Sequence, residues 1–326
     1  MARKSKWVEV QSPQEPVADV ARRALGDRLQ IVWRYLQRAS HGAPTDTENV
    51  HQLRVSSRRA VAAMEIFDAL LPRRRQQWMS KQLKRVRQAA GAARDLDVML
   101  ARFRPQADEE SVDDRFDALV HYLKVRRQRA QDPIDAIFEK LDQKRFRRRL
   151  RGLVQRARLR SKHDRFEEPT FFDAARSALE PMVVEFFQAA GGDFADYTAL
   201  HAFRIQGKHL RYAMEVFAGA FEPAFREELY PLVAALQERL GQVNDHATAR
   251  ELFALWLTED TLEESLRTLL ETLVAEEQSA LETKRDEFVG WWSKGRQADL
   301  QRRFAEVGLR PASAPPESEL VLRRAE

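Results

Sequence analysis

The chain has 326 residues, no cysteine and a formal net charge of +5 at pH 7. The length allows one large core or two closely packed halves. The absence of cysteine excludes disulfide bonds and thiolate metal sites, and it suits a cytoplasmic protein. Only 12 glycines occur and no run of alternating β-branched residues is seen, so the composition predicts an all-α protein.

The N-terminal residues show no targeting or membrane signal. No apolar run follows the basic residues 1–6, and no stretch of about 20 apolar residues exists to span a bilayer. We therefore expect neither a signal peptide nor a membrane span, and we expect residues 1–16 to form a flexible arm.

Four helices are expected in the first half of the chain. The first covers residues 17–39 and is ended by Gly42 and Pro44, after which Asp46 or Thr47 is a candidate N-cap. The others cover residues 50–67 with an end at Leu71-Pro72, residues 73–103, and residues 113–141 with a bend near Pro133. Their apolar positions recur at helical spacing: Leu25, Leu29, Val32 and Leu36; Leu53, Ala60, Met64 and Phe67; Met79, Leu83, Val86 and Ala90.

Residues 50–67 and 200–217 carry the same pattern. They read VHQLRVSSRRAVAAMEIF and LHAFRIQGKHLRYAMEVF. On a helix, the polar positions fall in one stripe about 80° wide, opposite the apolar one. The two cationic stripes, called here the first and second ladder, contain His51, Arg54 and Arg58, and His201, Arg204, Lys208 and Arg211. One such stripe is most simply a solvated face, but two in register favour a shared binding role. Glu65 and Glu215 are expected to pair with basic neighbours.

The offset of 150 residues continues along the chain and predicts an internal duplication. Residues 91–95 match residues 241–245, and Leu119, Leu123 and Phe138 match Leu269, Leu273 and Phe288. Each half then has about four helices, which predicts a duplicated pair of four-helix bundles. We expect a first half at residues 17–165, including a basic connecting helix near residues 144–162, a second half at residues 166–305, and a disordered tail at residues 306–326.

Gly91 and Asp95 have a structural interpretation. A glycine four residues before an acid is typical of a kink or a close helix crossing, with the acid paired to a basic group. That role is favoured over a catalytic aspartate. Arg94 is a further candidate for an anion site, although Asn244 at the matching position is neutral.

Positive charge is clustered. Residues 51–94 hold 11 lysines and arginines against 2 acids, whereas residues 201–244 hold 5 of each. Residues 140–165 hold 12 against 2. Local fields of this sign attract polyanions.

The residue patterns argue against an enzyme. Glu48 and His51 have the ExxH spacing of carboxylate di-iron bundles, but Thr198 replaces the glutamate in the second copy, and Arg54 and Arg58 would repel a divalent cation. No nucleophile elbow, phosphate-binding glycine loop or dinucleotide fingerprint occurs. We expect no catalytic residue, no metal and no cofactor.

The ladders suit an extended phosphate polymer. Arginine binds phosphate oxygens through two parallel hydrogen bonds and lysine acts as a point charge, while the two histidines would add charge as the pH falls. Few aromatic residues lie on the ladder face to stack bases. This favours a base-free polyanion over nucleic acid, although a nucleic-acid-binding protein and a phosphohydrolase or other polyphosphate-modifying enzyme stay open as alternatives.

The sequence resembles the CHAD family, the conserved histidine α-helical domain. The resemblance is carried by the paired H-x-x-R helices at His51 and His201, the run from Lys208 to Glu215, and the segments ending at Asp95 and Asp245. It covers about residues 15–305 and leaves no room for the triphosphatase-type domain that often accompanies this one, so a stand-alone member is expected.

The resemblance implies two four-helix bundles related by a pseudo-twofold axis, with a basic central groove or pore that binds inorganic polyphosphate. It also implies a cytoplasmic location at polyphosphate granules. The implied contacts are His51, Arg54, Arg58, Lys81, Lys84 and Arg85 in the first half and His201, Arg204, Lys208 and Arg211 in the second. The positions of the second half that match Lys81, Lys84 and Arg85 are Pro231, Ala234 and Ala235. The two halves are therefore expected to contribute unequally to polyphosphate binding. Polyphosphate chain length, oligomeric state and the role of residues 140–165 are left undetermined.

Overall fold

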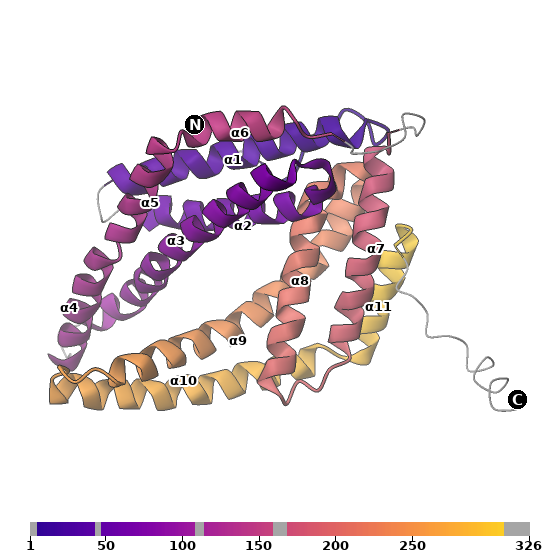
Figure 1. The fold of residues 1–326 in the computed structure, drawn as a ribbon. Coiled ribbons are helices and arrows are strands. Elements are labelled where there is room, and N and C mark those ends of the chain that lie inside the picture. The colour runs from indigo at the N-terminus through magenta and orange to yellow at the C-terminus, as the bar shows by residue number, and fades with distance from the viewer. Residues whose placement is uncertain (1–4, 43–46, 108–113, 159–167, 310–326) are drawn as a thin grey trace, which may run out of the picture. The chain divides into compact units, whose positions relative to one another are not determined.

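A computed structural model describes residues 5–42, 47–107, 114–158 and 168–309 (Figure 1). These residues form helices and connecting turns, with no strand among them, which confirms the predicted all-α class. The chain divides into two compact units. Unit 1 contains residues 1–14, 169–249 and 277–326, and unit 2 contains residues 15–168 and 250–276.

Unit 2 is built mainly from the first six helices. These are α1 (Val17–His41), α2 (Thr47–Ile66), α3 (Arg73–Ala107), α4 (Asp114–Arg129), α5 (Asp132–Gln143) and α6 (Phe146–Val154). Helix α2 packs between α1 and α3, α4 packs on α3, and both α5 and α6 contact α1 and α3. Figure 1 shows α6 running alongside α1.

The apolar stripes predicted for these helices form the core of unit 2. Leu29, Leu53 and Leu83 have no exposed surface, and each comes from a different helix. The other predicted stripe residues of α1, α2 and α3 are at most 2% exposed. Burial of these side chains contributes roughly 1.5–3 kcal/mol each, which fixes the rotation of each helix and turns its polar stripe outward.

The predicted fourth helix is divided in two. Residues 130–131 form a turn between α4 and α5, and Pro133 lies in the first turn of α5. Proline has no N–H for the carbonyl of Arg129, and its ring crowds that carbonyl, so a continuous helix cannot pass this point. The Gln131 amide supports the turn by donating to the Ala39 carbonyl and the Asp135 carboxylate, both at 2.8 Å.

The basic connecting helix is shorter than predicted. Helix α6 begins after Arg145, whose φ of 53° lies in the left-handed region, and it ends at Val154. Residues 159–162 of the predicted helix lie outside the described residues.

Unit 1 is built around α7 (Phe171–Ala190) and α8 (Tyr197–Phe217), which pack together, and it includes α11 (Lys294–Glu306). Helix α9 (Tyr230–Leu257) and helix α10 (Glu264–Trp291) contribute residues to both units. Helix α7 begins with a capping box in which Thr170 and Asp173 bond each other's backbone N–H groups. The Asp196 carboxylate caps α8 at the N–H of Thr198, at 2.8 Å.

Aromatic rings fill the core of unit 1. Phe203 of α8 lies at centroid distances of 5.0 Å from Phe186, 5.4 Å from Phe194 and 5.6 Å from Trp292. Phe203, Leu210, Met214 and Phe217 are at most 1% exposed, so the apolar stripe predicted for α8 is confirmed.

The two compact units do not coincide with the two predicted halves of the chain. Residues 250–276, predicted in the second half, belong to unit 2. There the ring of Trp256 lies 5.5 Å from that of Tyr122, and Phe253 lies 6.0 Å from Phe103. The Tyr122 hydroxyl also donates to Glu259 at 3.1 Å. These aromatic contacts bring the two distant segments into one core.

The segment predicted as a flexible arm makes specific contacts in unit 1. The Trp7 ring lies 4.7 Å from the Tyr230 ring at an angle of 71°. The guanidinium of Arg226 lies 4.7 Å from the Trp7 ring, and the ammonium of Lys6 lies 4.1 Å from the Tyr230 ring. The described residues of the segment are therefore packed, because the Trp7 ring anchors them. The basic composition of the segment does not indicate this contact.

Replacing Trp7 with alanine is expected to destabilise unit 1 by about 1–2 kcal/mol, through loss of the ring packing and of the cation–π contacts. Denaturant unfolding of the full chain measures the change. The exposed Glu9→Ala variant is the control and should stay within about 0.5 kcal/mol of the unmodified chain. Equal stability of the Trp7→Ala chain would show that the segment is not anchored.

The end of the chain is described as far as Leu309. This residue is fully buried, and its N–H donates to the Phe304 carbonyl at 2.9 Å. Most of the tail predicted as disordered, residues 310–326, lies outside the described residues.

Candidate functional site

The first ladder lies on α2, opposite the buried stripe of that helix. His51, Arg54 and Arg58 are half-buried, whereas Leu53 and Ala60 are fully buried. A helix rises 1.5 Å per residue, so the three ladder positions follow one another at roughly 5–6 Å. The sequence thus places them correctly on one face of one helix.

Arg54 is fixed to the neighbouring helix. Its Nη1 donates to the Asp95 carboxylate at 2.7 Å and to the Gly91 carbonyl at 3.3 Å, both on α3. A Cβ on Gly91 would lie 3.8 Å from the same nitrogen. The expected pairing of Asp95 with a basic group is confirmed, and part of the Arg54 charge is already offset by Asp95 before any ligand binds.

Helix α3 adds three cations to the same unit. Lys81 and Lys84 are exposed, and Arg85 is half-buried and donates to the Gln82 side chain at 3.3 Å. Gln82 is 2% exposed and bonds the Trp78 carbonyl of its own helix, so it holds Arg85 at a fixed position. Within the part of the chain that the structure describes, no carboxylate pairs with Lys81 or Lys84. Their charge is available to an anion.

The second ladder lies on α8 in unit 1. His201, Arg204 and Lys208 are half-buried, on the side opposite Phe203 and Leu210. The Nδ1 atom of His201 is buried and has no hydrogen-bond partner among the described residues. A buried nitrogen without a partner costs about 1–3 kcal/mol. A ligand oxygen or a water reaching this ring would remove that cost.

A glutamine that the sequence analysis did not single out lies beside the second ladder. A Cβ on Gly207 would overlap the Nε2 atom of Gln237 on α9, so the glycine permits this amide to lie directly on α8. Neither polar atom of the Gln237 amide has a partner in the described structure. A glycine inside a helix was the only available signal, since the pattern of α9 does not say which side chain would lie opposite it.

Arg211 differs from the other ladder cations. Its Nη1 donates to the Glu215 carboxylate at 2.8 Å and contacts the Tyr230 hydroxyl at 3.1 Å, and that hydroxyl donates to the same carboxylate oxygen at 2.8 Å. Glu215 has no exposed surface. The expected pairing of Glu215 with a basic neighbour is confirmed. Arg211 therefore compensates a buried carboxylate, which leaves less of its charge for a ligand.

These surroundings shift the pKa values of Tyr230 and Arg211. Burial, followed by the adjacent Glu215 charge, raises the pKa of Tyr230 to about 12. The pKa of Arg211 is also raised: desolvation opposes the rise, but the neighbouring Tyr212, Glu215 and Tyr230 outweigh it. Arg211 is thus a permanent cation here and Tyr230 a neutral hydroxyl near neutral pH.

Neither metal ligands nor a membrane span is found in the described part of the chain. No group of three or more histidine and acidic side chains is arranged to hold a metal ion. No described helix is both long and apolar enough to cross a bilayer.

Solved structures of other proteins have a similar helical fold. The chain aligns with the crystal structure of the CHAD domain from the plant Ricinus communis, with a TM-score of 0.60 and 22% identity over 97% of this chain and 98% of that one. It also aligns with PptA from Streptomyces chartreusis, with a TM-score of 0.60 and 18% identity over 86% of this chain and 100% of that one. At these identities the two likenesses show the fold alone.

Among curated proteins no sequence match was found. The family model of the CHAD domain, by contrast, matches residues 23–254, which include both ladders and the helices that carry them. The chain belongs to the CHAD-domain family.

Proposed function

We propose that the protein binds inorganic polyphosphate through its two ladders and the cations of α3, without chemical turnover, and that it acts as a targeting or scaffold module at polyphosphate granules. The family is associated with polyphosphate binding in general. The finer assignment to this chain depends on the residues described above.

The observation that carries the proposal is the position of the ladder cations. On both α2 and α8, histidine, arginine and the next basic residue occupy the side of the helix opposite the buried stripe. Neighbouring phosphates of a linear polymer are more closely spaced than successive cations along a helix. A phosphate can therefore lie beside each cation in turn as the polymer follows the helix. Each arginine can bind two oxygens of one phosphate.

The charges differ between the two units in a way that supports unequal contributions. Unit 2 has Lys81, Lys84 and Arg85 in addition to its ladder, whereas the matching positions of unit 1 are Pro231, Ala234 and Ala235. Arg211 is also committed to Glu215. We therefore assign the larger share of the phosphate contacts to unit 2. The internal duplication and a groove shared by both ladders stay predictions.

An enzyme and a nucleic-acid binder are the alternatives that an experiment must separate. Hydrolysis of a phosphoanhydride would use a metal held by carboxylates, so divalent-dependent release of phosphate by the pure protein would favour an enzyme. A nucleic-acid binder would need phosphate contacts and would select a duplex or a single strand over a polymer without bases.

Titration with polyphosphates of graded length tests the proposal. Affinity per molecule is expected to rise with chain length until both ladders and the α3 cations are occupied, and then to level off. The logarithm of the binding constant should fall linearly with the logarithm of the salt concentration, since bound polyanion releases counterions. Duplex DNA at the same salt and phosphate concentration is the competitor. A preference for DNA, or phosphate release with magnesium, would contradict the proposal.

A further inference from the structure

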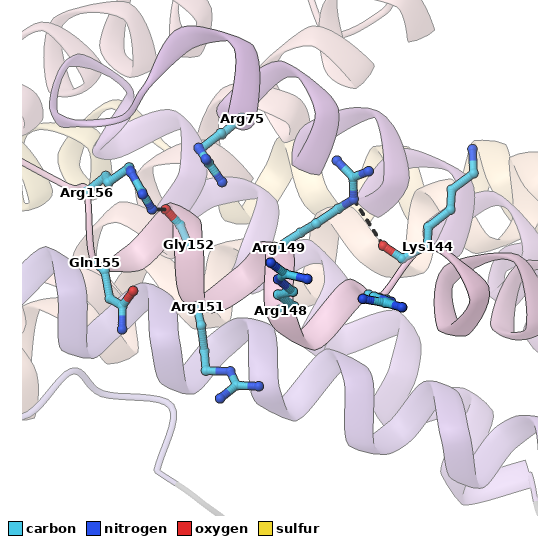
Figure 2. Close-up of a pocket in the computed structure, with 9 residues that line it drawn as sticks. Arg75, Lys144, Arg148, Arg149, Arg151, Gly152, Gln155 and Arg156 are labelled. Carbon is cyan, nitrogen blue, oxygen red and sulfur yellow. Dashed lines mark hydrogen bonds between the residues drawn. The ribbon is translucent and has the colours of Figure 1, made fainter.

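A second concentration of positive charge occurs in unit 2, away from the ladder positions in the sequence. It lines a hollow of about 580 Å³ on α6 and the start of α3 (Figure 2). The lining residues are Arg75, Lys144, Arg145, Arg148, Arg149, Arg151, Gly152, Gln155 and Arg156. Seven of the nine are cations and none is an acid, so the hollow, called here the α6 pocket, has one sign of charge throughout.

The fold forces these cations to the surface. Phe146, Leu150 and Leu153 are at most 3% exposed and anchor α6 against α1 and α3. The Phe146 ring lies 5.3 Å from the ring of Trp33 and 6.4 Å from that of Trp78. With one side of a short helix held this firmly, the arginines on its remaining positions cannot turn inward.

Two guanidinium groups converge over Gly152. A Cβ at this position would lie 2.8 Å from Nη1 of Arg75 and 3.6 Å from Nη1 of Arg156. Arg156 is held there because the same Nη1 donates to the Gly152 carbonyl at 3.1 Å. Arg75 comes from α3 and Arg156 from the turn just after α6, and the lack of a side chain on Gly152 allows both guanidinium groups to lie close to this residue. Two like charges this close repel each other, and a bound anion would relieve the repulsion.

The other wall of the α6 pocket is also held in place. The Nε of Arg149 donates to the Lys144 carbonyl at 3.0 Å, and its guanidinium lies 4.7 Å from the Trp78 ring. Arg145 is the only non-glycine residue with a positive φ in the described ranges. The left-handed region costs such a residue roughly 1–2 kcal/mol, and conformations of this kind cluster at ligand sites.

The cations of the α6 pocket have few counter-charges. Among the residues that the structure describes, no carboxylate pairs with Arg75, Lys144, Arg148 or Arg151. By contrast, Arg176 on α7 has Glu180 at 2.7 Å and Arg302 on α11 has Glu306 at 2.7 Å. The field of the pocket is therefore not cancelled locally, and it favours an anion of several charges.

The chemistry of the walls selects the kind of anion. Guanidinium groups match phosphate oxygens in pairs, and five or more of them in a small volume suit several phosphates held together. None of the residues that line the α6 pocket is aromatic, and the ring of nearby Trp78 already has the Arg149 guanidinium 4.7 Å from its centroid. We propose that the α6 pocket is a second anion site that binds a compact condensed phosphate, with tripolyphosphate as its simplest probe. This site does not depend on ligand binding by the ladders.

Calorimetric titration of the full chain with tripolyphosphate tests the site. A triple variant with Arg75→Gln, Arg148→Gln and Arg151→Gln is expected to bind the probe on the order of 10- to 100-fold more weakly, since each lost contact is charge-assisted. The matched control replaces three exposed arginines of the same unit, Arg34, Arg104 and Arg129, with glutamine. It changes the net charge equally and should retain most of the affinity.

A second variant separates geometry from net charge. Gly152→Ala keeps every charge but places a methyl group against Arg75, and it should weaken tripolyphosphate binding several-fold while leaving the helix content unchanged. A chain with neutralised ladders serves as the third arm and should bind tripolyphosphate like the unmodified protein, even where it no longer binds long polyphosphate.

Three outcomes would overturn the inference. The first is an equal loss of tripolyphosphate affinity in the triple variant and its matched control, and the second is loss of tripolyphosphate binding on neutralising the ladders alone. The third is that duplex DNA, rather than tripolyphosphate, is the ligand whose binding depends on Arg75, Arg148 and Arg151. The first would leave only a general attraction to positive charge. The second would assign all anion binding to the ladders. Failure of the ladders to bind long polyphosphate would contradict the proposed function and leave the α6 pocket unaffected.

Discussion

Neutralising Arg54, Arg58, Arg204 and Lys208 together with glutamine is expected to weaken binding of long-chain polyphosphate at least about 100-fold near physiological salt. The four side chains supply two cations from each ladder. Each neutralised contact removes one released counterion, so the slope of log K against log salt should also become shallower by about 3. Fluorescence or calorimetric titration at three salt concentrations measures both quantities.

The control for this variant has the same change in net charge. Lys284, Arg285, Lys294 and Arg302 lie on α10 and α11, within unit 1, and all four are replaced by glutamine. General attraction between a basic protein and a polyanion would lower the affinity of both variants equally. That result would remove the special role of the ladders.

Arg54 requires a separate measurement because of its bond to Asp95. Both side chains are partly exposed, at 26% and 34%, so removing the pair is expected to cost roughly 1 kcal/mol or less. Thermal unfolding of the quadruple variant should therefore remain cooperative. A double variant with only Arg58→Gln and Lys208→Gln leaves the Asp95 contact in place, and it should show about half the change in salt slope.

Replacing Glu215 with leucine is expected to destabilise the protein by about 3–5 kcal/mol. The substitution removes the carboxylate that accepts hydrogen bonds from both Arg211 and the Tyr230 hydroxyl, at a position with no exposed surface. Arg211, whose side chain is only 22% exposed, would be left without its carboxylate, and removing one member of a buried pair costs far more than the pair contributes. Glu215→Gln retains a carbonyl acceptor and should lose less.

An exposed pair on α7 provides the control. Arg176 and Glu180 have the same i, i+4 relation as Arg211 and Glu215, but their side chains are 49% and 40% exposed. Glu180→Gln should change the free energy of unfolding by less than about 0.5 kcal/mol. Similar effects of Glu180→Gln and Glu215→Leu would mean that burial of the Arg211 pair has no energetic importance.

The same cluster predicts a loss of stability in alkali. The pKa of Tyr230 is raised to about 12, by burial first and by Glu215 second. The unfolded chain releases this proton near pH 10, whereas the folded chain keeps it until about pH 12. The contribution of the neutral hydroxyl is therefore complete below pH 10 and is lost as the pH rises to 12. It amounts to about 2–3 kcal/mol.

Tyr230→Phe isolates this contribution. The variant should unfold with a shallower pH dependence between pH 10 and 12, while Tyr122, whose pKa is likewise raised to about 12, keeps its own share. Urea unfolding at pH 8, 10 and 11 provides the comparison. If the free energy of unfolding of the variant depended on pH as it does in the unmodified chain, ionisation of Tyr230 would not contribute to the loss of stability in alkali.

The sequence predicts those parts of the fold that depend on local pattern. The apolar stripes of α1, α2, α3 and α8 are all buried, and helix starts at Val17 and Arg73 match because the preceding Pro16 and Pro72 punctuate the chain. What a stripe contacts is a different matter. Nothing in the pattern of residues 250–276 indicates that Phe253 and Trp256 lie against Phe103 and Tyr122, because helical periodicity defines a face and not its partner.

The candidate site shows the same division. The face of each ladder follows from spacing, and so does the i, i+4 relation between Arg211 and Glu215. The burial of Glu215 depends on Tyr230 and on the chain around Val8, whose N–H bonds the Glu215 carbonyl at 3.4 Å. The α6 pocket cannot be predicted from local pattern either. The sequence shows that residues 140–165 are basic, but the contribution of Arg75 requires its side chain, from the start of α3, to reach Gly152.

The contribution of α9 and α10 to both compact units has a consequence for dissecting the protein. The backbone passes from one unit to the other after residues 14, 168, 249 and 276, so no single cut yields two intact bodies. A fragment ending at residue 168 would lack Phe253 and Trp256, so the rings of Phe103 and Tyr122 would lose these contacts and become exposed to solvent. The main segment of either unit produced alone, residues 15–168 or residues 169–249, is therefore expected to expose apolar surface and to self-associate unless a second molecule supplies the missing segments.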